Sequence, residues 1–188
     1  TGITDGEGFF SINFDLPPED RAVIYATAQS PVLAASQQRG VFVSDSVRLA
    51  TVLGRKPVAT DIVINERTTV ATAYAMAQFF NNEGIDGPSP GLQNAADILT
   101  RLVELDTGNT TLFLNTFPNG SSTTTQGAFN SLSNMLAACV RDENECDTLF
   151  DLATTPGGNQ PDDILMAALN IAHFPWQNVQ DLFDLSLE

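Results

Sequence analysis

His173 is the only histidine in the chain, so any mechanism that needs an imidazole base depends on this residue. It follows Asn170–Ala172, where the apolar pattern predicts the end of a helix, and a histidine there can stabilise the negative end of the helix dipole. A catalytic base would also need an activated nucleophile, and we assign no serine to that role. We therefore expect His173 to cap or pack, and the protein not to be an enzyme.

Several carboxylates are neighbours in the sequence, and a pair of carboxylates is the usual machinery of a glycosidase. A glycosidase holds its two groups on opposite sides of a cleft, which adjacent positions do not establish. We therefore expect these pairs to be charges at helix ends and in loops. The pairs are Glu19 with Asp20, Asp142 with Glu143, and Asp162 with Asp163.

One short segment concentrates oxygen ligands of the kind that calcium prefers. It contains Asp142, Asn144, Glu145 and Asp147. Their spacing differs from that of an EF-hand loop, and no glycine lies between them. Calcium at Asp142, Asn144 and Asp147 is therefore a secondary hypothesis, and otherwise we expect no metal and no cofactor.

Two cysteines, Cys139 and Cys146, bracket Val140–Glu145, which includes most of this segment. Their separation is not that of a redox pair, so a structural disulfide is the leading interpretation and a reactive thiol pair is the alternative. Closing so short a ring would stabilise the fold by about 2.5 kcal/mol through the lost entropy of the unfolded chain. A disulfide indicates an oxidising compartment, so we expect an extracellular or cell-surface protein.

The net charge is −15, from 23 acidic residues against 8 lysines and arginines. A phosphate backbone would be repelled, so we expect no binding to nucleic acid. A solvated acidic surface is the simplest interpretation, and a surface that gathers divalent cations is the alternative. No apolar run approaches the roughly 20 residues needed to cross a bilayer, so we expect no membrane span.

The first 64 residues have the character of strands and loops. Phe10, Ile12 and Phe14 alternate with polar residues, as in a strand with one buried face. Strands are predicted at 9–14, 22–28 and 41–43, a short helix at 46–53 ending at Gly54, and a strand or extended lead-in at 61–64.

From residue 65 the apolar residues recur with the period of a helix. Asn65 can cap the first helix, and Asp162 and Asp163 suit the positive end of a later one. Helices are predicted at 65–82, 92–105, 126–140, 147–153, 162–172 and 175–185, with a polar surface segment at 109–126. The expected fold class is α+β: a partial antiparallel β layer (an incomplete sandwich) over residues 1–64, followed by a mostly α-helical bundle over residues 65–188 with one disulfide.

Two parts of the chain resemble known sequences. Thr4-Asp5-Gly6-Glu7-Gly8-Phe9-Phe10-Ser11-Ile12 resembles the turn-and-strand signature of carboxypeptidase-regulatory-like (transthyretin-like) β-sandwich modules. The helical segment that follows such a module in large secreted bacterial surface proteins is similar to Ile64–Ala77, Leu132–Cys139, Cys146–Phe150, Ala153–Gly158 and Ala167–Ala172. The resemblance implies a secreted or surface-exposed protein, a partial sandwich that lacks its first strands, and a disulfide between Cys139 and Cys146. It implies no particular chemistry.

The turn at Thr4–Gly8 would normally join the strand at Phe9–Phe14 to a preceding strand, but only three residues come before it. The missing partner would then be a removed segment or another chain. Unpaired backbone groups at a sheet edge are a template for association. We therefore expect an extracellular structural protein, a self-assembling filament-type subunit or surface module. Its assembly strand would carry Phe10, Ile12 and Phe14 and pair with copies of itself or with another surface protein.

Two alternatives remain open. The first is a monomeric ligand-binding or accessory module of a larger bacterial surface protein. The second is a secreted hydrolase.

Overall fold

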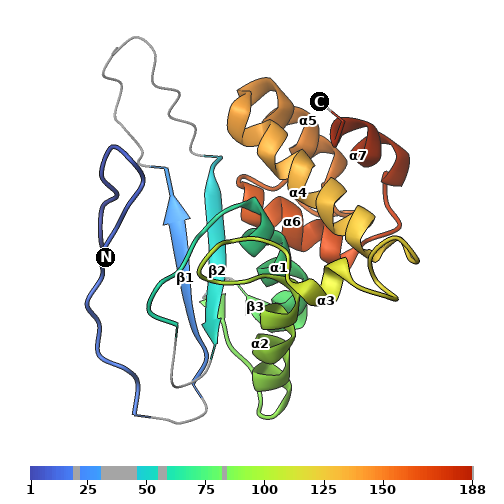
Figure 1. Cartoon of the computed structure of the whole chain (residues 1–188). Helices are drawn as coiled ribbons and strands as arrows, with labels where there is room; N and C mark the ends of the chain where they lie inside the picture. Colours follow the sequence, from blue (N-terminus) through green and yellow to red (C-terminus); the bar gives the residue numbers. More distant parts are fainter. Residues whose placement is uncertain (19–21, 31–45, 55–58, 82–83, 188) are drawn as a thin grey trace, which may run out of the picture.

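The computed structural model describes residues 1–18, 22–30, 46–54, 59–81 and 84–187. Within these residues a strand pair packs beside a helical body, and the N-terminal segment (residues 1–18) lies on the outer side of the strand pair (Figure 1). The elements in chain order are β1 (Ile24–Gln29), β2 (Arg48–Gly54), α1 (Glu66–Met76), the 3-10 turn η1 (Ala77–Phe79), β3 (Phe80–Asn81), β4 (Gly84–Ile85), α2 (Gly91–Leu102), α3 (Leu112–Asn115), α4 (Thr125–Arg141), α5 (Glu143–Leu152), α6 (Ile164–His173) and α7 (Val179–Leu185).

The α+β class predicted from the sequence is confirmed, and so is the disulfide between Cys139 and Cys146. The strand predicted at 22–28 is confirmed as β1, which extends to Gln29. The strand predicted at 41–43 lies outside the described residues, as does the acidic pair Glu19 and Asp20.

β1 and β2 form an antiparallel pair that is anchored through β2. The register places Thr27 opposite Ala50, with an irregularity between Ile24 and Tyr25. Residues Ala50–Leu53 are buried, and helices α1, α2 and α6 pack against β2. The predicted division at residue 64 therefore marks the change from strands to helices, and one hydrophobic core continues across it.

The short helix predicted at 46–53 is wrong, because this segment is the strand β2. Successive residues of β2 are buried on both faces of the strand, so the alternation that would have identified it is hidden. Thr51 and Val52 are β-branched and favour an extended backbone. Gly54, expected to end a helix, instead ends the strand with a φ of +88°.

α1 begins as predicted, at a capping box built by Asn65. The Asn65 side chain accepts a hydrogen bond from the Thr68 amide at 3.0 Å, and the Thr68 hydroxyl accepts one from the Asn65 amide at 2.9 Å. Asn65 Nδ2 also donates to the Gly108 carbonyl at 3.2 Å. Gly108 has a φ of +66°, and a side chain there would collide with Asn65, so only glycine fits this contact.

The predicted extension of this helix to residue 82 is wrong. α1 ends at Met76, and the chain continues through η1 into β3. There Phe80 pairs with Ile85 of β4 in a small antiparallel sheet. Phe80, which continued the helical pattern, is therefore part of a strand that pairs with residues close by in the chain.

The later helices lie near their predicted positions. Asp163 caps α6, since its carboxylate accepts from the Met166 amide at 2.8 Å. α5 begins before its predicted start because Asp142 caps it and accepts from the Asn144 amide at 3.0 Å. The polar segment predicted at 109–126 contains the short helix α3.

Candidate functional site

The two edges of the β1–β2 pair differ in what covers them. The outer edge of β2 meets α1: the Ala50 amide donates to Thr69 Oγ1 at 3.0 Å, and this hydroxyl donates to the Asn65 carbonyl at 2.7 Å, with the Ala50 carbonyl 3.5 Å away. Just before β2, the Ser46 carbonyl accepts from the Ile164 amide of α6 at 2.9 Å. Helices α1 and α6 therefore close this edge to a further strand.

The edge along β1 is open in the sense that, among the described residues, β1 pairs with β2 alone. The N-terminal segment lies on this side of the strand pair but makes no backbone hydrogen bond to β1 in the described residues (Figure 1). The Ser30 amide donates across the pair at 3.0 Å, while the Ala50 amide points away from β1. Backbone groups of an antiparallel strand point alternately toward and away from the partner. With this register Tyr25, Thr27 and Gln29 direct their amides and carbonyls outward, and these groups have no hydrogen-bond partner in the described part of the chain.

The N-terminal segment contains the turn predicted from its glycines. The Asp5 amide donates to the Phe9 carbonyl at 2.9 Å, and the Asp5 carboxylate accepts from the amides of Glu7 and Phe9. Gly8 has a φ of +88°, whereas Gly6 has no positive φ. The turn therefore folds locally, on hydrogen bonds made within five residues of chain.

The strand predicted at Phe9–Phe14 is wrong for the chain by itself, because in the described structure these residues pair with no other strand. Phe10 is half-buried, Ile12 is 41% exposed and Phe14 is 50% exposed. A strand needs a neighbour for its backbone groups, and an alternating apolar pattern does not by itself supply one. The role of Phe10, Ile12 and Phe14 as an assembly strand stays a prediction.

The disulfide joins α4 to α5. The Cα atoms of Cys139 and Cys146 are 4.3 Å apart, and both residues are buried. The expected polar loop between them is nearly absent, because only Asp142 separates the two helices. The pair is therefore a structural link in the core and not an exposed thiol site.

Two of the residues considered for calcium bond to each other at the start of α5. Asp142 Oδ1 accepts from both the amide and the side-chain nitrogen of Asn144, at 3.0 and 2.9 Å. Among the described residues no group of three or more histidine, cysteine, aspartate or glutamate side chains is placed to hold a metal ion. Calcium at Asp142, Asn144 and Asp147 stays a prediction, with Asp142 already used as the cap of α5.

His173 is the exposed last residue of α6, the helix end that the sequence predicts. It lines a cavity of about 370 Å³ together with Arg48, Asp162 and Asn170. Arg48 pairs with Asp163 at 3.2 Å beside this cavity, so the Asp162–Asp163 pair serves a helix start and an ion pair. No serine bonds to His173 in the described part of the chain.

The chain contains a G-x-S-x-G match that bears on His173. It is Gly87-Pro88-Ser89-Pro90-Gly91, which follows β4 and ends at the first residue of α2. A nucleophile elbow holds its serine in a strained turn. Ser89 is not strained in this way, because Asn178 is the sole non-glycine residue with a positive φ among those described. The motif therefore lacks the backbone geometry of a nucleophile elbow.

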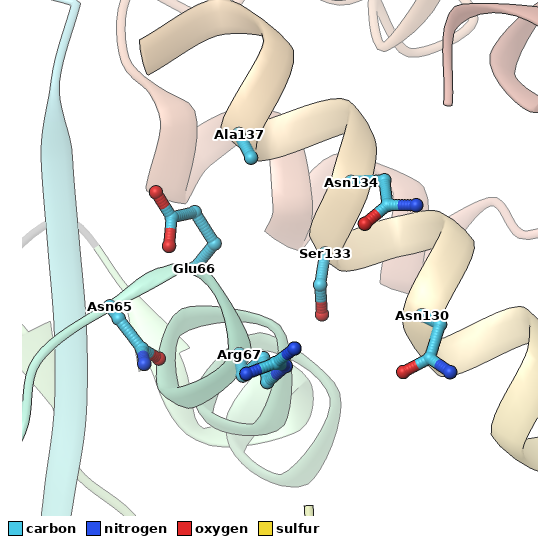
Figure 2. A pocket seen from close by; sticks show the side chains of 7 residues that line it. All are labelled: Asn65, Glu66, Arg67, Asn130, Ser133, Asn134 and Ala137. Atoms are coloured by element: carbon cyan, nitrogen blue, oxygen red, sulfur yellow. The ribbon is translucent and has the colours of Figure 1, made fainter. Parts of the chain in front are cut away.

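A polar cleft lies between the start of α1 and the middle of α4 (Figure 2). Its volume is about 380 Å³. Figure 2 shows Ser133 pointing from α4 toward α1, with Ala137 beside the Glu66 side chain. The lining residues are Asn65, Glu66, Arg67, Asn130, Ser133, Asn134 and Ala137. Spacing within the sequence gives no signal for this cleft, because its walls come from segments more than 60 positions apart.

An apolar groove of about 680 Å³ lies between α4 and α7. Buried Met135, Ile171 and Leu182 line it, with the more exposed Phe183 of α7. Tyr74 of α1 also lines the groove, and burial raises the pKa of its phenol above the usual value of 10.0.

No family model, no curated protein and no solved structure matches this chain. In the described residues no helix is both long enough and apolar enough to cross a bilayer.

Proposed function

We propose that this chain is an extracellular structural module that assembles with copies of itself by β-strand addition. The supporting observation is the contrast between the two edges of the strand pair. α1 and α6 close the edge of β2, whereas β1 presents the outward amides and carbonyls of Tyr25, Thr27 and Gln29. An added strand would satisfy these groups through main-chain hydrogen bonds and needs no preformed pocket.

The proposed donor is the N-terminal segment of a neighbouring copy. Phe10, Ile12 and Phe14 alternate along it, and none of them belongs to the core of their own chain. Pairing with β1 of a neighbour would give this segment backbone partners and would cover one apolar face. Donor and acceptor are different segments of the chain, so a contact in which each copy donates to the next is head-to-tail and generates a filament unless its rotation closes a ring.

The disulfide supports the extracellular part of the proposal. Buried disulfides persist in oxidising compartments and are rare in the cytosol. The proposal assigns no catalytic activity to the chain.

A single substitution at the open edge tests the proposal. Thr27→Pro removes one outward amide, and proline is tolerated in an edge strand where the N–H faces solvent, so the β1–β2 pair should persist. Sedimentation velocity at several concentrations and electron microscopy should show that this variant no longer assembles. Thr27→Ala, which keeps the amide, is the matched control and should assemble like the unaltered protein.

Deleting residues 1–14 tests the donor: the helical body should keep its circular dichroism spectrum and assembly should be lost. Unaltered assembly of Thr27→Pro would contradict the proposal. Unaltered protein that remains monomeric at every concentration would contradict it too, and would favour a monomeric accessory module.

A further inference from the structure

The polar cleft of Figure 2 is lined almost entirely by polar and charged side chains. Asn65, Glu66 and Arg67 come from the start of α1, and Asn130 and Asn134 come from α4. Apart from Ala137, every lining side chain carries a hydrogen-bonding group, and no aromatic residue lines the cleft. Its volume of about 380 Å³ is within the size range of small-molecule sites.

Part of this hydrogen-bonding capacity is already used within the chain. Asn65 caps α1, the Ser133 hydroxyl donates to the Phe129 carbonyl at 2.9 Å, and Arg67 Nη1 donates to Asn109 Oδ1 at 3.2 Å. These bonds hold the floor and one wall of the cleft in place. The remaining donors of the Arg67 guanidinium are left for a ligand.

Three other side chains of the cleft have all their hydrogen-bonding groups available for a ligand. Glu66, Asn130 and Asn134 form no hydrogen bond or ion pair with any described residue. The carboxylate supplies acceptors, and each amide supplies an acceptor and two donors on adjacent atoms. A ligand in this cleft therefore meets acceptors and donors side by side on both walls.

The chemistry of the lining excludes several ligand classes. An anion would face the Glu66 carboxylate, and a cation would face the Arg67 guanidinium, so the two charges together favour a ligand without net charge. An apolar ligand would leave the amides of Asn130 and Asn134 without partners, which costs free energy. Hydroxyl groups fit, because each one both donates and accepts a hydrogen bond.

We propose that this cleft binds one residue of a neutral saccharide. Neighbouring hydroxyls of a sugar ring pair with Glu66 and the Arg67 guanidinium on the α1 side and with Asn130 and Asn134 on the α4 side. Because the cleft is open to solvent, further residues of a longer glycan can continue beyond it. This site lies on the helical body and does not involve the β1 edge. The sugar-binding proposal can therefore be tested independently of strand assembly.

Ligand-detected NMR and titration calorimetry on the full chain test the proposal. The probes are glucose, galactose, mannose and N-acetylglucosamine, each as the monosaccharide and as α- and β-linked trimers. At least one trimer should bind at about 10 mM or below. The double variant Asn130→Ala with Asn134→Ala should weaken that binding by about 5- to 100-fold, from the loss of two to four neutral hydrogen bonds.

The matched control is Asn94→Ala, an exposed asparagine on α2 outside the cleft, which should bind like the unaltered protein. Alanine favours helices, so neither variant should lose its fold, and circular dichroism checks this. No binding by any probe overturns the proposal. Binding that the double variant retains in full also overturns it, because the sugar then binds elsewhere. Thr27→Pro should bind the same sugar unchanged, which separates this test from that of assembly.

Discussion

The helical body and the N-terminal segment both contain large apolar residues, but only the helical body buries them. In α6, Ile164, Leu165 and Leu169 are at most 3% exposed, whereas Phe9 and Ile3 of the N-terminal segment are 70% and 93% exposed. A helix satisfies its backbone internally and needs only a surface to pack against, while a strand needs a second strand. The difference between the two regions therefore lies in where their backbone hydrogen bonds can be made.

The β1–β2 strand pair is intermediate between the helical body and the N-terminal segment in how firmly it is held. A two-stranded sheet is marginally stable by itself in water. Here β2 is held by the helices through Thr69 and through buried Ala50 and Val52, while β1 meets the helical body less closely. Stability should therefore decrease from the helices through β2 to β1 and then to the N-terminal segment.

The largest difference should appear when one apolar side chain is truncated in each region. Leu165→Ala removes a fully buried side chain from α6 and should lower the free energy of unfolding by about 2–5 kcal/mol. Ile12→Ala should change it by about 0.5 kcal/mol or less. Urea unfolding followed by circular dichroism measures both changes. Equal losses in the two variants would mean that the N-terminal segment packs into the core, and the comparison would fail.

Removing the disulfide should have the next largest effect. Cys139→Ala combined with Cys146→Ala should lower the free energy of unfolding by about 2.5 kcal/mol, because the unfolded chain gains entropy. The same urea titration, without reductant, measures the loss. Sedimentation velocity should show unchanged assembly, since the disulfide lies between α4 and α5 and not at the β1 edge. Free thiols in the unreduced protein, found by mass spectrometry, would contradict the disulfide itself.

The smallest effect concerns Tyr74 and appears only at alkaline pH. Burial raises the pKa of its phenol in the folded protein, so the unfolded chain releases this proton at a lower pH than the folded chain does. The associated stability is present below about pH 10 and is lost as the pH rises through the folded pKa. Tyr74→Phe should therefore make the urea midpoint fall less steeply between about pH 9 and pH 11. If the urea midpoint falls equally steeply in both proteins, the burial of Tyr74 does not contribute to the pH dependence of stability.

Features that depend on near neighbours in the chain were predictable from the sequence. Asn65 caps α1, Asp163 marks the start of α6, and Cys139 and Cys146 are close enough along the chain for their pairing to be expected. The turn at Asp5 belongs to the same class, because its carboxylate bonds to amides within four residues. Each of these depends on hydrogen bonds or ring closure over a short stretch of sequence.

Tertiary structure alone decided the rest. The segment 46–53 became a strand because it pairs with β1 and because helices pack against it and close one of its edges, and no pattern inside the segment reveals these contacts. Phe9–Phe14 has the alternation of a strand but lacks a partner, since pairing is a property of two segments. The polar cleft likewise exists only where the start of α1 meets α4. Local periodicity and caps are encoded within a few residues, whereas an edge or a cleft depends on which distant surfaces meet when the core packs.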